Sequence, residues 1–198
     1  NTVELVKQFA VVHPRVRVIV HSENLGYANS NLTGYTNATG EVIAVVDSDG
    51  QHHLSDLPLF LAELDKGHDV VYGWRKVRHD PTIRKMVSVG LSLLSQFLLK
   101  WPHHDINCGF RVVKACVAHS ITKVHRVNYF GPELWVHSVR HGYSVGEVIA
   151  RHSERAGGVS INAPWRLPLN MWKAFQYLLA LREDMHTPLL ARTKSSSV

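Results

Sequence analysis

The chain contains 198 residues, of which 45% are hydrophobic and 19% are charged. This size permits one compact domain whose core needs no disulfides, and the composition excludes disordered and collagen-like proteins. The formal net charge of +6 suits partners that carry phosphates or other negative groups. The longest uncharged stretch of helical pattern, Met86–Leu99, is 14 residues long. Because a membrane span needs about 20 residues, we expect no spanning helix.

Hydrophobic runs rich in β-branched residues alternate with helical patterns, which predicts an α/β domain with a mostly parallel sheet flanked by helices. Strands are expected at Val16–His21, Glu41–Asp47, Asp69–Trp74, Gly109–Val113 and Tyr143–Ala150. Helices are expected at Asn1–Ala10, Tyr27–Ala38, Leu54–Lys66, Thr82–Lys100, Pro132–His141 and Trp165–Arg182. Residues 1–182 are expected to form the domain, and residues 183–198 a flexible tail.

The sharpest motif is Asp47-Ser48-Asp49, at the end of the most continuously hydrophobic expected strand. Ligands of α/β sheets bind beyond the carboxyl ends of the strands. Two carboxylates at such a position can converge on one Mg²⁺ or Mn²⁺, which prefer oxygen ligands and substrate phosphates. Gln51 and His52 follow closely and could complete the coordination. The alternative is a simple turn, because Asp and Gly are common turn residues.

Three further segments carry polar or basic groups next to glycines. Gly73-Trp74-Arg75 ends another expected strand, and the basic residues after it, which include Arg84, suit phosphates. Asp105–Arg111 (DINCGFR) leads into a strand through a tight turn. The loop Arg151–Ser160 contains two arginines and two glycines and could close over phosphates. The alternatives are a solvated loop for Gly73–Arg75, a tight turn with a buried Phe110 for Asp105–Arg111, and an ordinary connection for Arg151–Ser160.

Two expected helices are hydrophobic beyond a narrow stripe. Core packing is the expected explanation for Thr82–Lys100. For Trp165–Arg182, tryptophan, tyrosine and basic residues are also typical of a helix at a membrane surface, so core packing and membrane binding both stay open.

With these motifs in this order, the sequence resembles family 2 glycosyltransferases of the GT-A fold, and more narrowly the dolichyl- and polyprenyl-phosphate sugar transferases. The resemblance extends from residue 1 to about Arg182. The matching segments are Asn24-Leu25-Gly26, Asp47–His52, Gly73–Arg75, Asp105–Arg111, Glu133-Leu134 and Arg155-x-x-Gly158-x-Ser160. Ile161 stands where the family usually has Lys. The family's first strand and its Asp-Asp-Gly-Ser segment have no counterpart, so the domain is expected to be N-terminally incomplete.

The resemblance implies a set of site residues. Mg²⁺ or Mn²⁺ would be held by Asp47, Asp49 and Gln51. The nucleotide-sugar donor would be bound by Asn24, Gly26, Asp47, Ser48 and Asp49. Substrate phosphates would be bound by Arg75, Arg84, Arg111, Arg155 and Ser160. Catalytic roles would fall to Asp49, Asp105, Arg111 and Glu133.

The activity that the resemblance implies is metal-dependent, inverting transfer of a sugar from a donor of the GDP-mannose or UDP-glucose type to a polyprenyl or dolichyl phosphate. The enzyme would lie at the cytoplasmic face of a membrane. An acceptor phosphate is already anionic at pH 7, so no strong general base is required. If the acceptor were a hydroxyl, Asp105 or Glu133 would be the candidate base. A transferase with a saccharide acceptor and a non-catalytic phosphate-binding fragment stay open as alternatives. A nucleic-acid partner is not expected, since the sequence has no motif for one.

Overall fold

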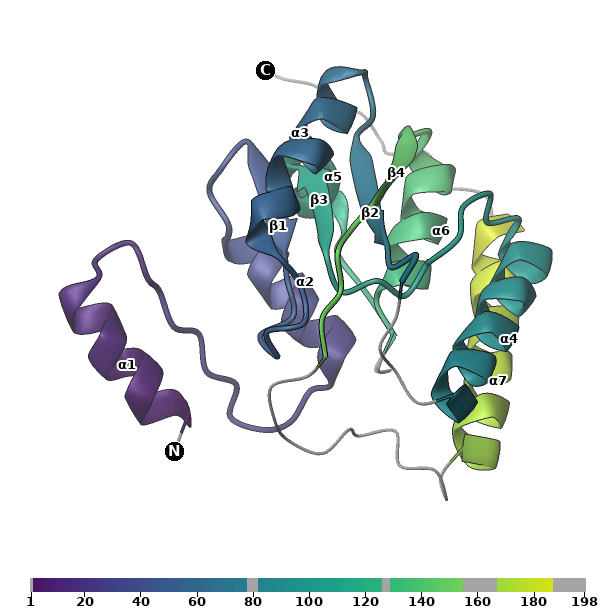
Figure 1. The fold of residues 1–198 in the computed structure, drawn as a ribbon, viewed down its shortest axis with the longest axis horizontal. Coiled ribbons are helices and arrows are strands. Elements are labelled where there is room, and N and C mark those ends of the chain that lie inside the picture. The colour runs from purple at the N-terminus through teal and green to yellow at the C-terminus, as the bar shows by residue number, and fades with distance from the viewer. Residues whose placement is uncertain (1, 78–81, 126–128, 155–166, 187–198) are drawn as a thin grey trace, which may run out of the picture.

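The computed structural model describes residues 2–77, 82–125, 129–154 and 167–186. A central sheet is flanked by helices, and the first helix lies apart from the rest (Figure 1). The elements in chain order are α1 Thr2–Val12, α2 Tyr27–Asn37, β1 Val42–Val45, the 3₁₀ turn η1 Leu54–Asp56, α3 Leu57–Asp65, β2 Val70–Trp74, α4 Thr82–Leu99, β3 Arg111–Lys114, α5 Ala115–Ser120, α6 Gly131–His141, β4 Val145–Ile149 and α7 Leu167–His186.

The sheet has the strand order β1-β3-β2-β4. β2 and β4 are parallel, but β3 runs antiparallel to both β1 and β2. The α/β class is therefore confirmed, whereas the sheet is mixed rather than mostly parallel. The direction of β3 follows from the connection between α4 and β3. This connection returns to the carboxyl end of β2, where Gly73 N donates to Phe110 O at 3.0 Å. From that edge β3 can only run in the opposite direction.

Each face of the sheet has its own hydrophobic core. On one face, Phe60 of α3 packs against Val71, Phe110 and Val112, and the Phe60 and Phe110 rings stack at 4.2 Å between centroids. On the other face, α2, α5 and α6 cover the side chains of β1, β2 and β3, and α7 packs against α6. The domain therefore has three layers, with the sheet between two layers of helices. The ends of the strands remain available for a site.

One expected strand is wrong. Residues 16–20 have no regular secondary structure and pair with no described strand, and Ile19 and Val20 are exposed. A β-branched run forms a strand only where a partner completes its backbone hydrogen bonds, which a sequence pattern cannot supply. The short helix α5 was not expected, and α7 continues to His186, past its expected end at Arg182. The rest of the expected tail, residues 187–198, lies outside the described residues.

The core packing expected for α4 holds at its C-terminal end, where Leu98 and Leu99 are buried in the core. The outward face of α4 carries Met86, Val89, Leu93 and Phe97, which are 69%, 58%, 59% and 80% exposed. These positions follow one stripe of the helix, opposite the buried residues of its last turns. α4 lies beside α7 (Figure 1), where Trp172 is 58% exposed. Among the described residues, no helix is long and apolar enough to cross a membrane.

Candidate active site

The antiparallel direction of β3 brings two predicted motifs to the same edge of the sheet. Val45, the last residue of β1, pairs with Arg111, the first residue of β3. The Asp47–Asp49 segment leaves β1 at this edge, and the Asp105–Phe110 segment enters β3 there. The carboxyl end of β2 lies at the same edge, because Tyr72 also pairs with Arg111. Segments that are far apart in the sequence thus converge on one place.

The Asp47 carboxylate packs directly on the backbone of Gly109. An ideal Cβ placed on Gly109 would lie 2.5 Å from Asp47 Cγ and closer still to Asp47 Oδ2. Any side chain at position 109 would therefore displace the carboxylate. Gly109 has no positive φ, so the need for glycine arises from this contact and not from the backbone conformation.

A half-buried tyrosine holds the other oxygen of Asp47, and a buried arginine lies behind that tyrosine. Tyr27, at the start of α2, donates its hydroxyl to Asp47 Oδ1 at 2.8 Å. Arg111 in turn donates Nη2 to the Tyr27 hydroxyl at 3.0 Å and to Asn31 Oδ1 at 3.4 Å. Burial raises the pKa of Tyr27, with the Asp47 charge adding to this shift, so the phenol keeps its proton as a donor.

Arg111 was expected to contact substrate phosphates, but its side chain is 1% exposed and lies over the Phe130 ring at 5.3 Å. A guanidinium at this depth has no access to a bound phosphate in the present conformation. In this conformation Arg111 lies behind Asp47 and is linked to it through the Tyr27 hydroxyl. The sequence contains no signal for this, because an arginine after Gly-Phe reads equally well as a surface residue.

The expected donor-binding residues Asn24 and Gly26 shape the start of α2. Asn24 Oδ1 accepts a hydrogen bond from Gly26 N at 2.9 Å, and Gly26 precedes the helix with φ of 83°, a conformation that favours glycine. This turn sets the direction in which Tyr27 enters the site. Ser48 is exposed between the two aspartates.

The residues that follow Asp49 are hydrogen-bonded to Ser153, just after β4. Gln51 N donates to Asp49 Oδ1 at 3.2 Å, while its side chain Nε2 donates to Ser153 O at 3.1 Å. Ser153 N donates back to Gln51 O at 2.8 Å, and the His53 Nε2 and Ser153 Oγ atoms lie 2.7 Å apart. Gln51 is buried. It was expected to be a metal ligand, and in the structure its amide nitrogen is hydrogen-bonded to Ser153 O.

His52 is a half-buried histidine close to the charged residues of the site. Its pKa is lowered, first by burial and then by Arg75, while Asp47, Asp49 and Asp105 act in the opposite direction. The charges of four predicted site residues, Arg75, Asp47, Asp49 and Asp105, thus all act on the His52 imidazole. Its ring makes edge contacts with Phe110 and with His152.

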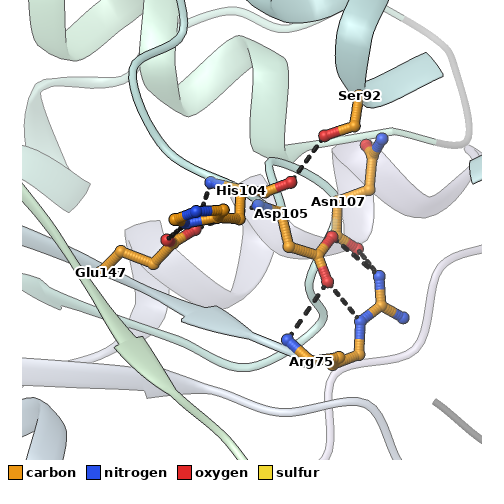
Figure 2. Close-up of polar contacts among 6 residues, drawn as sticks. All are labelled: Arg75, Ser92, His104, Asp105, Asn107 and Glu147. Atoms are coloured by element: carbon orange, nitrogen blue, oxygen red, sulfur yellow. Dashed lines mark hydrogen bonds and ion pairs between the residues drawn. The ribbon is translucent and has the colours of Figure 1, made fainter. Parts of the chain in front are cut away.

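Arg75 and Asp105 form a two-pronged ion pair. Arg75 Nε donates to Asp105 Oδ2 at 2.7 Å, and Arg75 Nη2 donates to Asp105 Oδ1 at 3.0 Å (Figure 2). The turn around Asp105 is held by Glu147 of β4, whose Oε1 accepts from His104 N at 2.9 Å and from Asp105 N at 3.0 Å (Figure 2). Both predicted residues therefore reach the site, but in this conformation they neutralise each other.

Glu133, in the first turn of α6, is buried and engaged by His125. Its Oε1 accepts from His125 N at 2.9 Å and lies 2.9 Å from His125 Nδ1. Burial raises the pKa of Glu133, and His125 opposes the shift. These contacts link α6 to His125, which precedes it in the chain. Arg155 and Ser160 lie outside the described residues, and of Arg84 only the position in α4 is described.

A divalent cation fits the donor chemistry of this site in part. Asp47 and Asp49 offer carboxylate oxygens, which Mg²⁺ and Mn²⁺ prefer. In the described part of the chain, no group of three or more His, Cys, Asp or Glu side chains could hold a metal ion. An ion at these two carboxylates would thus take its remaining oxygens from substrate phosphates and water, which is common for Mg²⁺.

Comparison with solved structures defines the fold class. The chain is similar to glucosyl-3-phosphoglycerate synthase from Mycobacterium tuberculosis, solved with Mn²⁺, uridine diphosphate and phosphoglyceric acid. The TM-score is 0.56 at 15% identity, over 89% of this chain and 58% of that one. A second structure of the same enzyme gives 0.55 at 16% identity, over 85% and 57%. The GT-A fold expected from the sequence is confirmed.

Sequence comparison identifies the family. Residues 1–127 match the model of glycosyl transferase family 2, and the chain belongs to this family. It is 29% identical over 147 residues to dodecaprenyl-phosphate galacturonate synthase from Rhizobium johnstonii, and the aligned region covers 73% of this chain and 43% of that protein. It is 33% identical over 138 residues to an uncharacterised glycosyltransferase from Mycobacterium bovis, which covers 68% and 63%. The chain thus spans less than two thirds of the length of these relatives.

Proposed function

We propose that residues 1–182 transfer a sugar from a nucleotide sugar of the GDP-mannose or UDP-glucose type to a polyprenyl or dolichyl phosphate, with inversion. The observation that carries the proposal is the contact between Asp47 and Gly109, because it joins the Asp-Ser-Asp motif to the Asp105–Arg111 motif at one sheet edge. Support for the acceptor comes from a similar protein that is named a dodecaprenyl-phosphate galacturonate synthase.

Asp47 and Asp49 would hold a Mg²⁺ or Mn²⁺ ion. When bound, such an ion neutralises the charge that develops on a diphosphate leaving group. The two carboxylates provide the negative charge and hard oxygens that the ion requires, and Asp47 is already fixed at both of its oxygens. The presence of Mn²⁺ in the structures of a protein with the same fold supports this part of the proposal.

A phosphate acceptor suits the state of the two candidate bases. Asp105 accepts two guanidinium hydrogen bonds from Arg75, and Glu133 is engaged by His125. A carboxylate with its lone pairs committed in this way is poorly placed to remove a proton from a hydroxyl. A phosphate oxygen needs no such help, since it is already ionised near pH 7.

Arg75 is the described arginine best placed to meet a substrate phosphate. The guanidinium edge that now holds Asp105 has the same paired N–H geometry that phosphates accept. A phosphate entering at this edge would therefore compete with Asp105 for Arg75. Arg84, Arg155 and Ser160 complete the proposed set of phosphate contacts.

The helices α4 and α7 would bring the site to the cytoplasmic surface of a membrane. An outward helix face that carries Met86, Val89, Leu93 and Phe97 is unusual for a helix facing water only. Exposed Trp172, followed by exposed Lys173 on α7, has the composition of an interfacial helix. This position would place the site near an acceptor that is itself anchored in lipid.

The transfer reaction tests the function. The protein is incubated with Mn²⁺ and radiolabelled GDP-mannose or UDP-glucose, together with undecaprenyl phosphate, undecaprenol or a soluble oligosaccharide. We expect label to appear only on the lipid phosphate, with the anomeric configuration inverted by NMR. Transfer to the alcohol or the oligosaccharide instead would refute the acceptor assignment. Donor binding without any transfer would favour a non-catalytic phosphate-binding chain.

A matched pair of variants tests the metal site. Asp49→Asn should abolish Mn²⁺-dependent transfer, since it removes one of the two carboxylates. Asp65→Asn makes the same chemical change at an exposed position at the end of α3, at the opposite end of the sheet, and should retain full activity. Retained activity in Asp49→Asn would remove this residue from the site.

Vesicle flotation tests the membrane surface. The protein should float with vesicles that contain anionic phospholipid, and Phe97→Glu should reduce the bound fraction several-fold. Leu59→Glu, at an exposed leucine of α3, introduces the same charge away from α4 and should float as the unmodified protein does. Equal flotation of the two variants would show that α4 is not the docking face.

A further inference from the structure

The contacts behind Asp47 form a short chain of hydrogen bonds that reaches into the core. Arg111 Nη2 donates to the Tyr27 hydroxyl at 3.0 Å, and the hydroxyl donates to Asp47 Oδ1 at 2.8 Å. A phenol can accept one hydrogen bond and donate another at the same time. Here it does both, and its two partners are a buried cation and a carboxylate of the proposed metal site.

The buried Arg111 has few other ways to balance its charge. Its pKa is raised despite burial, which opposes the shift, and the groups that raise it are the phenols of Tyr27, Tyr35 and Tyr72 and the carboxylate of Asp47. Among these groups, Asp47 is the one carboxylate. Arg111 and Asp47 are thus charge partners that meet through a tyrosine.

From this geometry we infer that Tyr27 is a positioning residue that orients and polarises Asp47 for a divalent cation. A guanidinium that donates to the phenol oxygen makes the O–H a stronger donor, since hydrogen bonds in a chain reinforce one another. The strong donor fixes Oδ1, while the Gly109 backbone confines Oδ2. One carboxylate orientation then remains, and hydrogen bonds that orient a ligating group typically contribute 10- to 100-fold in metal affinity.

This role rests on the proposed metal site and adds to it a residue that does not touch the ion. It also explains why the site includes a tyrosine just after the Asn24–Gly26 turn. The turn places Tyr27 at the first position of α2. From there its hydroxyl contacts both Asp47, just after β1, and Arg111 of β3. A phenylalanine at this position would fill the same volume and leave Asp47 Oδ1 without this donor.

The test is Mn²⁺ binding to the intact chain, measured by electron paramagnetic resonance of the free ion, so that no turnover is needed. Tyr27→Phe should raise the Kd for Mn²⁺ at least about 10-fold. Tyr35→Phe is the matched control: it lies on the same helix, close to Arg111, and its hydroxyl has no hydrogen-bond partner among the described residues. Its Kd should stay within about twofold of the unmodified value.

A second measurement uses the unmodified protein and does not depend on how well a variant folds. With tyrosine labelled at ¹³Cζ, titration with diamagnetic Mg²⁺ should shift the Tyr27 resonance, because the ion competes for the electron density of Asp47. The Tyr35 resonance should stay in place.

The outcomes separate the two proposals. If the unmodified chain binds Mn²⁺ and Tyr27→Phe binds it equally well, or if Mg²⁺ leaves the Tyr27 resonance unchanged, the positioning role is overturned while the metal site stands. If the unmodified chain binds no Mn²⁺ at all, the metal site is overturned and the role of Tyr27 with it. Weaker binding in Tyr27→Phe alone supports both.

Discussion

Substitution of Gly109 by alanine should disable the metal site and leave the fold intact. The new Cβ would lie 2.5 Å from Asp47 Cγ, whereas ordinary contact begins at 3.4 Å. The carboxylate must therefore retreat by about 1 Å or more, and it is free to do so because Asp47 is a partly exposed side chain at a strand end. The backbone has no reason to move, since Gly109 has no positive φ.

The size of the effect follows from what the retreat breaks. The hydrogen bond from Tyr27 to Asp47 Oδ1, now 2.8 Å long, would be lost, which costs about 0.5–1.5 kcal/mol of unfolding free energy. Divalent metal affinity should fall by roughly 10- to 100-fold, because a ligating carboxylate loses its orientation. The functional loss should thus be much larger than the loss of stability.

Calorimetric titration with Mn²⁺ and a chemical unfolding curve measure the two quantities in the same preparation. Gly34→Ala is a suitable control, because its new Cβ meets nothing within 4 Å and lies inside α2. This control should gain about 0.5–1 kcal/mol from helix propensity and bind Mn²⁺ normally. Normal Mn²⁺ affinity in Gly109→Ala would refute the argument that Asp47 and Gly109 meet in one site.

Two further predictions concern stability. Asp47→Asn should lower the unfolding free energy by about 1–3 kcal/mol, because it leaves the buried Arg111 without its carboxylate partner. Asp49→Asn should change the unfolding free energy by less than about 0.5 kcal/mol. Equal unfolding free energies for the two variants in urea would contradict this reasoning. Burial and neighbouring basic groups lower the pKa of His137 to about 4, so the unfolded chain, with a His pKa near 6.5, binds the proton first as pH falls. The melting temperature should therefore decline between about pH 6.5 and pH 4, and His137→Gln should flatten that decline; identical pH profiles would exclude this contribution.

Much of the fold could be predicted because its strands and helices carry local signals. The run Glu41–Asp47 predicted β1 within two residues at each end, since a nearly continuous β-branched stretch indicates a strand. The expectation that this strand is buried was wrong, because β1 is an edge strand in which only Ile43 is buried. The same kind of signal at Val16–His21 was misleading, because strand formation depends on a partner that lies elsewhere. The direction of β3 could not be predicted either, as alternation of hydrophobic residues is the same in parallel and antiparallel sheets.

The site could be predicted as a set of segments but not as a set of contacts. Motif order placed Asp47, Asp49, Arg75 and Asp105 near one another, and the charges that act on His52 agree with this. The sequence did not reveal that Arg75 and Asp105 bind each other. It also gave no sign of Tyr27, because an aromatic residue at the first position of a helix is more often part of a core.

The pairing of β1 with β3 has a consequence for how the molecule folds. Val45 pairs with a residue more than 60 positions further along the chain, and α3, β2 and α4 all lie between the two strands. Closing so large a loop is entropically costly, so this ladder forms after the local helices and slows the approach to the native state. Asp47 meets Gly109 only when that closure is complete. If the proposed metal site binds a cation, that cation is bound by the native chain alone and draws the folding equilibrium toward it.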